Sequence, residues 1–497
     1  MSTTHQTDLL PAVDDFLASA PLKGWIAGAE AASSSGETFT TTDPGTGQPI
    51  AEVHAMQPDD VDRAVAAATD AFRDTPWARM APNDRSALLH RLADAVESDL
   101  PAIAQLESLD AGKLLAQAEG DVANFVATVR YYADLAQHLQ YRTTRAIPRH
   151  DAWVVRQPWG PCGFIFPWNF PMLLLGWGIA PALAAGNTVV VKPAEDTPLS
   201  NLYVARLAQQ AGIPDGVINV VPGLGSVTGA AVAAHPGLKR MSFTGSPEVG
   251  RLVGEACGRN LTPVKLELGG KGAAVVFDDI DLDATVESLA QAITFHTGQV
   301  CCDATRWLID RSIYDQFVEA AANRLEQVTI GYQLEPDSAM GPVVNDKQRR
   351  RVLGYLQRGR DEGAQVILQG GPADVPGRDG FYVKPALLAG SLENVAARDE
   401  IFGPVAYLAP FGSEQEAIEM ANATAYGLAN SVWTTDMGRA ARVAESMVAG
   451  NSWINAHNIF PHGVPYGGVN KSGMGGGVLS EETLLDYFRS LSVVRPR

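Results

Sequence analysis

The regular alternation of short apolar segments with longer helical ones, which begins at Cys162, restricts the fold of this chain more than any other feature. Stretches rich in Ala and Leu, long enough for crossover helices, separate four apolar segments at 162–166, 188–192, 217–221 and 238–243. This order predicts parallel βαβ units, which can bind a dinucleotide at the carboxyl ends of their strands. A second series follows Gly269, with strands expected at 273–277, 306–309, 364–368 and 430–435 and helices near 312–327, 346–359 and 437–448. We therefore predict an α/β protein with at least two domains, because 497 residues exceed what one core holds.

Before Cys162, apolar residues recur at helical spacing in three segments, at 61–72, 88–96 and about 122–135. The first stretch of the chain, about 20 residues, carries few such positions, so we expect a mobile tail there. Residues 152–158 and 484–496 alternate like exposed strands, and they either pair with each other or cover a partner subunit.

The net charge of −18 argues against a nucleic-acid partner, because phosphates would be repelled. The sequence opens without a basic segment followed by an apolar one, and no apolar run reaches the ~20 residues of a membrane helix. Its four cysteines form no C-x-x-C pair, which disfavours a disulfide framework or a zinc site and suits a reducing compartment. We expect a cytoplasmic protein with no membrane partner and no bound metal.

Two segments contain candidate catalytic residues. Cys301 and Cys302 are adjacent in GQVCC, and a nucleophile requires a thiolate stabilised by backbone dipoles or a nearby base. Most buried cysteines are small apolar residues, and the sequence alone does not choose between the two. Glu267 lies at the end of a probable strand, on the face opposite Leu266 and Leu268. It is either exposed at a strand edge or partly buried with a raised pKa, as a general base requires.

Three further segments place polar residues where a strand meets a helix. Asn169 in FPWNFP either caps the following helix or donates a hydrogen bond to a developing oxyanion. Glu195, just after the strand that ends at Lys192, can accept hydrogen bonds from a ribose and would repel a 2′-phosphate. The turn at Gly245 and Ser246 offers free amides at a helix N-terminus, which suit a pyrophosphate.

Several motifs in this order are far more specific together than singly: FPWNFP, KPAEDTP, FTGS, LELGGK, GQVC, EIFGP at 400–404 and PYGG at 465–468. With them the chain resembles the hydrolytic, non-phosphorylating branch of the aldehyde dehydrogenase superfamily, from about residue 22 onward. The resemblance implies an α/β fold in three parts and a homodimer or homotetramer. These parts are a Rossmann-like NAD-binding domain (1–137 and 159–268), an α/β catalytic domain (269–477) and a small β oligomerisation region (138–158 and 478–497).

The same resemblance assigns roles to individual residues. Cys301 would be the nucleophile, with Cys302 an inert neighbour. Asn169 and the backbone N–H of Cys301 would hold the oxyanion, and Glu267 would activate the water that releases the acid. The implied cofactor is NAD, with NADP less favoured. Its expected ligands are Lys192 and Glu195 at the adenosine ribose, Gly225 beside the adenine, Ser246 and Trp168 near the pyrophosphate, Glu400 at the nicotinamide ribose, and Phe402 packed nearby.

The chain departs from the family pattern at several positions. Asp303 stands two residues beyond Cys301, where a small uncharged residue is usual, and a carboxylate facing the site would raise the pKa of the thiol. Gly178 stands in place of a Lys, and Gly476-Gly477 in place of an Arg-Glu pair. That Lys and Glu help to export a proton from the general base in the family, so their absence predicts a different proton route. Asn470 replaces a common Lys.

The substrate tunnel implied by this resemblance is apolar and aromatic. Its expected lining is Phe170, Leu174, Trp177, Phe295, Phe460 and Tyr466. Such a tunnel suits a medium-chain aliphatic or an aromatic aldehyde, and none of the six side chains is basic, as a carboxylate-bearing semialdehyde would need. An aminoaldehyde or betaine aldehyde also fits, because aromatic rings can hold a cation. The sequence leaves open a coenzyme A-acylating enzyme, which Glu267 disfavours, and a non-catalytic NAD-binding member of the family.

Overall fold

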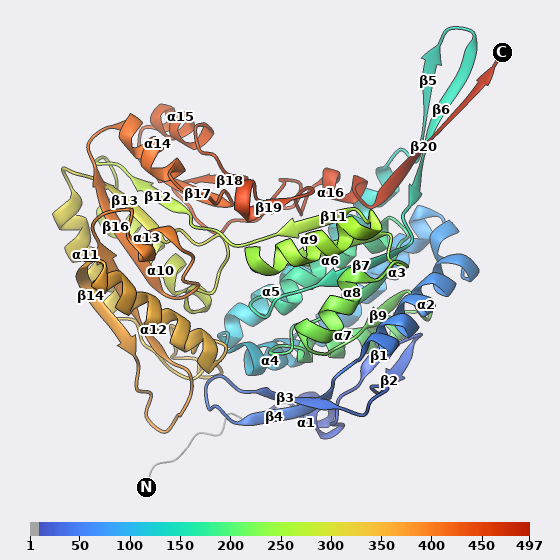
Figure 1. The fold of residues 1–497 in the computed structure, drawn as a ribbon, viewed down its shortest axis with the longest axis horizontal. Coiled ribbons are helices and arrows are strands. Elements are labelled where there is room, and N and C mark those ends of the chain that lie inside the picture. Colours follow the sequence, from blue (N-terminus) through green and yellow to red (C-terminus); the bar gives the residue numbers. More distant parts are fainter. Residues whose placement is uncertain (1–8) are drawn as a thin grey trace.

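Two large sheets organise the computed structural model, which describes residues 9–497 (Figure 1). The first sheet has the strand order β19-β11-β10-β7-β8-β9-β1-β2. Its parallel centre consists of β7 (Pro161–Ile165), β8 (Thr188–Lys192), β9 (Ile218–Val220), β10 (Arg240–Thr244) and β11 (Val264–Glu267). Antiparallel edges are added by β1 (Gly24–Ile26), β2 (Ala29–Ala31) and β19 (Gly473–Met474). The four strands expected in this region are confirmed.

Helices cover both faces of the first sheet, because successive side chains of a strand point to opposite sides. Val189 and Val191 belong to one core, and Val190 between them belongs to another. The core around Val189 is completed by α3 (Pro82–Ser98), α4 (Leu100–Ala111), α5 (Leu115–His138), α6 (Pro171–Ala184) and α7 (Leu199–Gln210). The core around Val190 is completed by α2 (Pro58–Asp74), α8 (Ala230–Ala234) and α9 (Pro247–Asn260). The three expected helical segments lie within α2, α3 and α5.

The second sheet has the order β14-β15-β16-β13-β12-β17-β18 and is parallel except for β14 at one edge. Its strands are β12 (Ala273–Val276), β13 (Arg306–Asp310), β14 (Gln365–Pro372), β15 (Val383–Ala389), β16 (Val405–Phe411), β17 (Ala429–Trp433) and β18 (Asn451–Ile454). The accompanying helices are α10 (Leu282–Thr294), α11 (Tyr314–Glu326), α12 (Asp346–Asp361), α13 (Val395–Arg398), α14 (Glu414–Asn422) and α15 (Met437–Glu445). The strands expected from sequence are β12, β13, β14 and β17, whereas β15, β16 and β18 were missed. Pro385 in β15 and Pro410 in β16 interrupt the apolar pattern that marks a strand.

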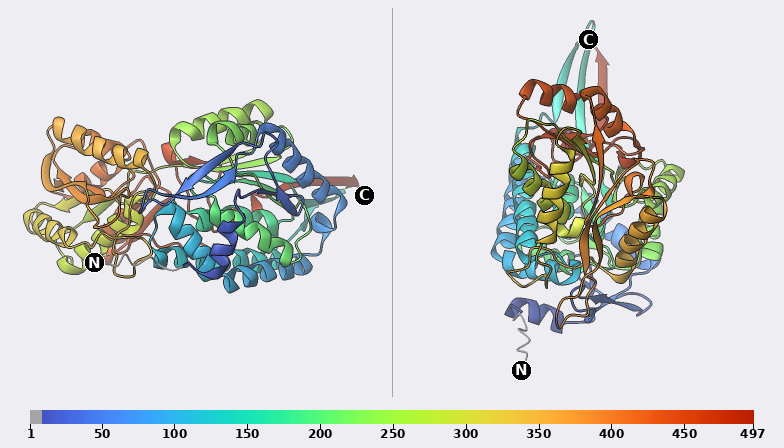
Figure 2. Two further views of the ribbon diagram at one scale, coloured as in Figure 1. Left: turned by 90° about the horizontal axis from the view of Figure 1, so that it is seen from below. Right: turned by 90° about the vertical axis from the view of Figure 1, so that its left-hand side faces the viewer.

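A third sheet, of order β20-β6-β5, projects from the body of the molecule (Figure 1). It consists of β5 (Arg142–Ile147), β6 (His150–Pro158) and β20 (Phe488–Pro496). The pairing of β20 with β6 runs from Phe488 opposite Pro158 to Pro496 opposite His150. Of the two possibilities left open by the sequence, the two alternating segments therefore pair with each other within one chain. A separate hairpin of β3 (Thr38–Thr42) and β4 (Pro49–His54) lies below the first sheet in Figure 1, and Figure 2 shows the molecule from two further sides.

The expected mobile N-terminal tail is wrong for residues 11–18, which form α1 (Pro11–Ala18). Val13 and Phe16 are buried, and the Phe16 ring packs edge-on against Tyr203 with 5.3 Å between ring centroids. Leu9 and Leu17 pack against the same core but are only partly buried. The rest of that prediction concerns residues 1–8, which lie outside the described part of the chain. No helix within residues 9–497 is long and apolar enough to cross a membrane.

Candidate active site

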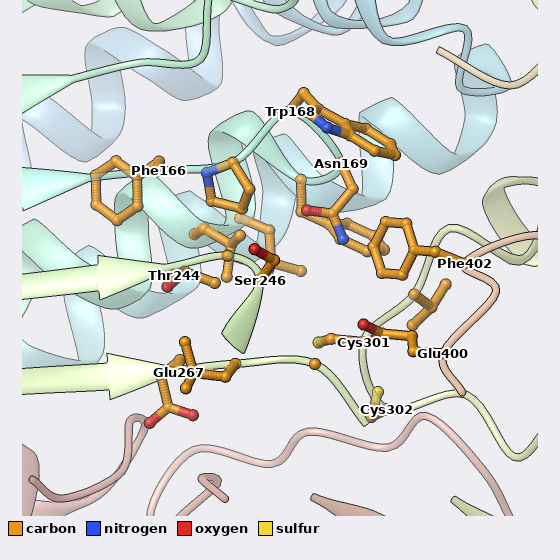
Figure 3. Close-up of a pocket in the computed structure, with 18 of the residues that line it drawn as sticks. Phe166, Trp168, Asn169, Thr244, Ser246, Glu267, Cys301, Cys302, Glu400 and Phe402 are labelled. Atoms are coloured by element: carbon orange, nitrogen blue, oxygen red, sulfur yellow. The ribbon is translucent and has the colours of Figure 1, made fainter. Parts of the chain in front are cut away.

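A cavity of about 1470 Å³ lies at the carboxyl ends of β7, β8, β10 and β11, and the second α/β body supplies its other wall. Parallel strands end at one edge of a sheet, so side chains distant in sequence meet there. Every residue that the resemblance assigns to catalysis, to the cofactor or to the tunnel lines this cavity: Trp168, Asn169, Phe170, Leu174, Trp177, Lys192, Glu195, Gly225, Ser246, Glu267, Phe295, Cys301, Glu400, Phe402, Phe460 and Tyr466. Figure 3 shows part of this wall.

Cys301 follows a tight turn in which three consecutive residues have positive φ. The values are 45° at His296, 56° at Thr297 and 69° at Gly298. The Gln299 side chain anchors the turn, because its Nε2 donates to the His296 carbonyl at 3.0 Å and its Oε1 accepts from the Val344 backbone N–H at 2.9 Å. The turn therefore fixes where Cys301 meets the cavity.

The surroundings of the two adjacent cysteines differ. Cys301 lies partly open to the cavity, and its sulfur is 3.5 Å from the Tyr466 hydroxyl. A hydrogen bond from the neighbouring Cys302 thiol lowers the pKa of Cys301, and the bond from Tyr466 adds to this effect against the opposing effect of burial. Cys302 is 2% exposed, its sulfur lies 3.2 Å from Asn458 Oδ1, and burial raises the pKa of its thiol well above the ordinary range. Cys301 is thus the better nucleophile of the two.

Glu267 ends β11 and is 7% exposed, and within residues 9–497 neither of its carboxylate oxygens has a hydrogen-bond partner. Burial raises the pKa of Glu267 to about 8, although the charge of Lys265 opposes the rise. Leu266 and Leu268 both pack into the core beneath α9, so the expected alternation along the strand is confirmed. Figure 3 shows the Glu267 carboxylate turned away from the Cys301 sulfur, so contact with a water beside Cys301 requires a side-chain rotation.

Asn169 does not cap α6, because the helix begins at Pro171 and its N-cap residue is Phe170, which makes no side-chain cap hydrogen bond. Met172 lies in the first turn of α6, and its backbone N–H donates to Glu107 Oε2 at 2.9 Å. Asn169 is 3% exposed, and its amide nitrogen donates one hydrogen bond of 3.0 Å to the Gln299 carbonyl. A side-chain amide carries two hydrogens, so one remains to donate toward an oxyanion on the Cys301 side.

Lys192 and Glu195 form one end of the cavity. The buried Lys192 ammonium donates to Glu195 Oε2 at 2.8 Å, and the Gly225 amide donates to Glu195 Oε1 at 3.3 Å. Burial alone would raise the pKa of Glu195, but Lys192 and the Gly225 amide outweigh it and keep the pKa low. An ionised carboxylate in this place accepts hydrogen bonds from ribose hydroxyls and repels a 2′-phosphate.

The cofactor residues nearer to Cys301 present complementary groups. Ser246 caps α9 by accepting a hydrogen bond of 3.3 Å from the Val249 amide, and the N-terminus of this 14-residue helix meets the cavity. The Trp168 and Phe402 rings pack edge-on at 5.3 Å (Figure 3). Glu400 accepts from the Gly270 amide at 3.0 Å, and burial raises the pKa of its carboxyl to about 7.

The tunnel residues form a connected set of rings next to Cys301. Trp177, Phe460 and Tyr466 contact one another, with centroid distances of 5.1 to 5.5 Å. Phe170 and Phe295 stack at 6.2 Å. The Trp177 indole nitrogen donates to Asn124 Oδ1 at 2.9 Å, so the polar part of this ring is satisfied and the rest of its surface is apolar.

Asp303 does not face the cavity. It is 2% exposed, its oxygens have no hydrogen-bond partner within residues 9–497, and burial raises the pKa of its carboxyl well above the ordinary range. The raised pKa favours the uncharged form of this carboxyl, which works against a charge beside the thiolate. Asn470 has a φ of 57°, a left-handed conformation that Asn adopts more readily than Lys, which explains the departure there.

Gly178 lies against two aromatic rings. A Cβ atom on Gly178 would come within 2.6 Å of Phe166 and 3.1 Å of Phe164. Aromatic rings therefore occupy the space beside α6 that a longer side chain at this position would need. Two residues that the sequence did not single out also belong to the site: Asn458, next to Cys302, and Lys265, next to Glu267. The strand alternation that places Lys265 on the same side as Glu267 could have identified the lysine.

The model of the family described as "Aldehyde dehydrogenase family" matches residues 31–493. The chain belongs to the aldehyde dehydrogenase family.

Relatives and solved structures agree with this assignment over nearly the whole chain. Retinal dehydrogenase 2 of Gallus gallus is 41% identical over 459 residues, which is 92% of this chain and 88% of the relative. An NAD+ complex of aldehyde dehydrogenase from Bacillus cereus has a TM-score of 0.95 at 37% identity and covers 98% of this chain and 99% of that one. A betaine aldehyde dehydrogenase from Staphylococcus aureus in complex with NAD+ has a TM-score of 0.94 at 33% identity, with 98% and 97% covered.

This aldehyde dehydrogenase is an NAD-dependent enzyme that oxidises aldehydes. Its own residues fit the cofactor, since Glu195 with its lowered pKa, the N-terminus of α9 at Ser246 and the Glu400 carboxyl group all line the cavity. The expected branch, fold class and cofactor are thus confirmed, while the role of each site residue stays a proposal.

Proposed function

We propose that this enzyme oxidises a medium-chain aliphatic or aromatic aldehyde to the carboxylic acid through a thioester on Cys301. One observation carries the proposal: a cysteine with a lowered pKa stands in the cavity wall between the aromatic tunnel and the groups that fit NAD. Asn169 and Glu267 line the same cavity.

In the first half-reaction the Cys301 thiolate attacks the aldehyde carbon, and negative charge develops on the carbonyl oxygen. The second amide hydrogen of Asn169 and the backbone N–H of Cys301 donate to this oxygen. One such donor lowers a barrier of this kind by about 3 kcal/mol. NAD, held by Lys192, Glu195, Ser246 and Glu400, would supply the hydride acceptor for this half-reaction. The acyl group then remains on Cys301 as a thioester.

In the second half-reaction Glu267 removes a proton from water, and the hydroxide releases the acid from Cys301. The carboxylate is poorly solvated and has a raised pKa, which makes it a stronger base than an exposed glutamate. A base in the same cavity, which reaches water beside Cys301 by a side-chain rotation, supports hydrolysis over transfer to coenzyme A.

The tunnel supports the proposed substrate class. Its six predicted lining residues offer aromatic and aliphatic surface, and the only polar group of the Trp177 side chain is hydrogen-bonded to Asn124. A second candidate is an aminoaldehyde or betaine aldehyde. Three mutually touching rings, Trp177, Phe460 and Tyr466, can surround a cationic group, and one similar solved structure is a betaine aldehyde dehydrogenase.

We further propose a cytoplasmic homodimer or homotetramer that assembles through the projecting third sheet. Ile147, Leu491 and Val494 in β5 and β20 expose large apolar side chains there. The four cysteines are all free thiols in the structure, which fits a reducing compartment.

The test follows NADH formation with a panel of aliphatic, aromatic, amino-, betaine and carboxy-aldehydes in the absence of coenzyme A. Wild type is compared with Cys301→Ala, and Cys302→Ala serves as the matched control. We expect fastest turnover with medium-chain or aromatic aldehydes, free acid as product, and loss of turnover only in Cys301→Ala. A preference for cationic aldehydes would favour the second candidate. Binding of NAD without oxidation of any aldehyde in the panel would contradict catalysis.

A further inference from the structure

Lys265 is buried next to the proposed general base, and no carboxylate within residues 9–497 is hydrogen-bonded to it. It lies two residues before Glu267 on β11, so both side chains emerge on the same side of the strand. Lys265 is 1% exposed, and its ammonium nitrogen donates to the Gly477 carbonyl at 2.7 Å. A buried lysine satisfied by one backbone carbonyl is costly, which makes a role in the reaction worth testing.

The Glu267 carboxylate and the Lys265 ammonium approach the same piece of backbone. A Cβ atom on Gly467 would lie 3.3 Å from Glu267 Oε1 and 2.9 Å from the Gly477 Cα. Gly477 is in turn the residue whose carbonyl accepts from Lys265. The carboxylate, turned away from Cys301 in Figure 3, is thus directed to the region of Lys265.

The glycine run before Gly477 brings this region close to a carboxylate that reaches solvent. A Cβ atom on Gly475 would lie 3.1 Å from the Lys265 Cα, and one on Gly476 would touch Asp486 Oδ2 within 2.5 Å. Asp486 has 34% of its side chain exposed and is held by Arg240 at 3.2 Å. The charged and titratable groups that face Lys265 are therefore Glu267 on its own strand, Arg240 on β10, and Asp486 and Tyr487 after α16 (Glu481–Leu485).

We propose that Lys265 is a positioning residue that takes the proton of Glu267 and passes it to solvent by way of Asp486. This proposal rests on the assignment of Glu267 as the base for hydrolysis. In each turnover water gives one proton to the Glu267 carboxylate, and the hydroxide attacks the thioester. The Lys265 ammonium releases a proton toward Asp486 and bulk water, and the neutral amine that results takes the proton of Glu267. One proton leaves per acid released, and both groups return to their starting forms.

The energetics favour exchange within this pair. Burial, together with the charge of Arg240, lowers the pKa of Lys265 to about 8 against the opposing charges of Glu267 and Asp486. Burial raises the pKa of Glu267 to about 8 as well. Because the two groups hold a proton about equally, its transfer between them costs little. Lys265 and Glu267 thereby carry out the proton export for which the family uses a Lys and a Glu. Gly178 and Gly477 stand at those two positions in this chain.

The experiment separates acylation from hydrolysis in the full-length enzyme. The burst of NADH reports formation of the thioester, and steady-state turnover across pH reports its hydrolysis. The variants are Lys265→Met, Lys265→Arg and Lys265→Gln. The matched control is Thr483→Val, because the Thr483 hydroxyl donates to the same Gly477 carbonyl at 3.1 Å but cannot carry a proton in this pH range.

We expect every Lys265 variant to keep the NADH burst and to lose about tenfold or more of kcat, as a lost proton-transfer group typically costs at least this much. In Lys265→Met the rise of kcat with pH should move to higher pH, because the positive charge that lowers the pKa of Glu267 is gone. Lys265→Arg keeps that charge but cannot give up a proton, so kcat should stay low without this upward move. Thr483→Val should retain the wild-type pH profile.

Wild-type kcat in Lys265→Arg would overturn the proposal, since a fixed charge would then suffice. An unchanged pH profile in Lys265→Met, or an equal loss in Thr483→Val, would overturn it too. If Lys265→Met does not fold, the pH profile of kcat in Lys265→Gln provides the same test. Failure of wild type to form NADH and free acid from any aldehyde in the panel would instead contradict the proposed function.

Discussion

The Lys192 ammonium and the Glu195 carboxylate are joined by a hydrogen bond of 2.8 Å at the cavity wall. Glu195 places a negative charge where the ribose 2′-oxygen of a dinucleotide is expected. The Lys192 ammonium is directed at this charge and not at a ligand. The preference for NAD over NADP should therefore depend on this one carboxylate.

Glu195→Gln should lower the ratio of kcat/KM for NAD to kcat/KM for NADP by about tenfold or more. Removing the charge relieves repulsion of a 2′-phosphate and frees Lys192 to bind it, a change on the order of 1–2 kcal/mol. The two cofactors are compared in steady-state assays with one aldehyde. Glu30→Gln, at a surface ion pair with Arg206, is the control and should leave the ratio unchanged. An unaltered ratio in Glu195→Gln would assign the selectivity to another residue.

Iodoacetamide should alkylate Cys301 at pH values lower than those an unperturbed cysteine requires. The thiolate is the reactive form, and a lowered pKa means that ionisation is complete at lower pH. Cys302, with a raised pKa, should remain a thiol over the same range. The rate of labelling is measured against pH, and peptide mass spectrometry locates the label. Label appearing first on Cys302 would reverse the assignment of the nucleophile.

Asp303→Asn should raise the thermal unfolding midpoint by a few degrees at pH 7 to 8, with a smaller gain near pH 4. The folded-state pKa of this carboxyl is raised, so its contribution to stability is fully present below the unfolded-state pKa and is lost as pH rises through the folded-state pKa. An amide has no proton to lose and escapes this penalty. Calorimetry at several pH values checks the trend, and a gain that does not depend on pH would contradict the stated cause.

Gly178→Ala should destabilise the enzyme by about 1–3 kcal/mol, because the added methyl group overlaps the Phe166 ring. Phe166→Leu should relieve part of this cost, so the double variant should be more stable than the sum of the single changes predicts. Denaturant unfolding of the four proteins gives the coupling. Strict additivity would show that Phe166 is not what excludes a side chain at this position.

The sequence predicted the frame of the first sheet well, because buried parallel strands appear as uninterrupted apolar runs such as TVVVK at β8. It predicted α1 and β16 poorly for the opposite reason. In α1 two buried side chains do the docking, and in β16 a proline sits within the strand. Apolar sequence patterns identify elements in which buried residues recur regularly. They miss elements that are held in place by a few individual contacts.

The candidate site was predicted as a set of residues, whereas their chemical states were not. Motifs brought Cys301 and Glu267 together, but the choice between Cys301 and Cys302 depends on the hydrogen bond between the two thiols, on the burial of Cys302, and on Tyr466, which lies 165 residues from Cys301 in the chain. The raised pKa of Asp303 depends on the packing around it, which no local pattern contains. A pKa is set by three-dimensional surroundings, and these become visible only in the structure.

Strand β19 pairs with β11, and β20 pairs with β6, so residues 473–496 complete structures begun by residues 150–267. A ribosome makes these late strands only after more than two hundred intervening residues have emerged. The surroundings of Glu267, including the Gly475–Gly477 backbone, therefore cannot exist on a nascent chain. Such distant pairings slow folding and leave strand edges open in the meantime. Newly synthesised molecules should consequently gain activity late. They should depend on chaperones until β19 has paired with β11 and completed the first sheet.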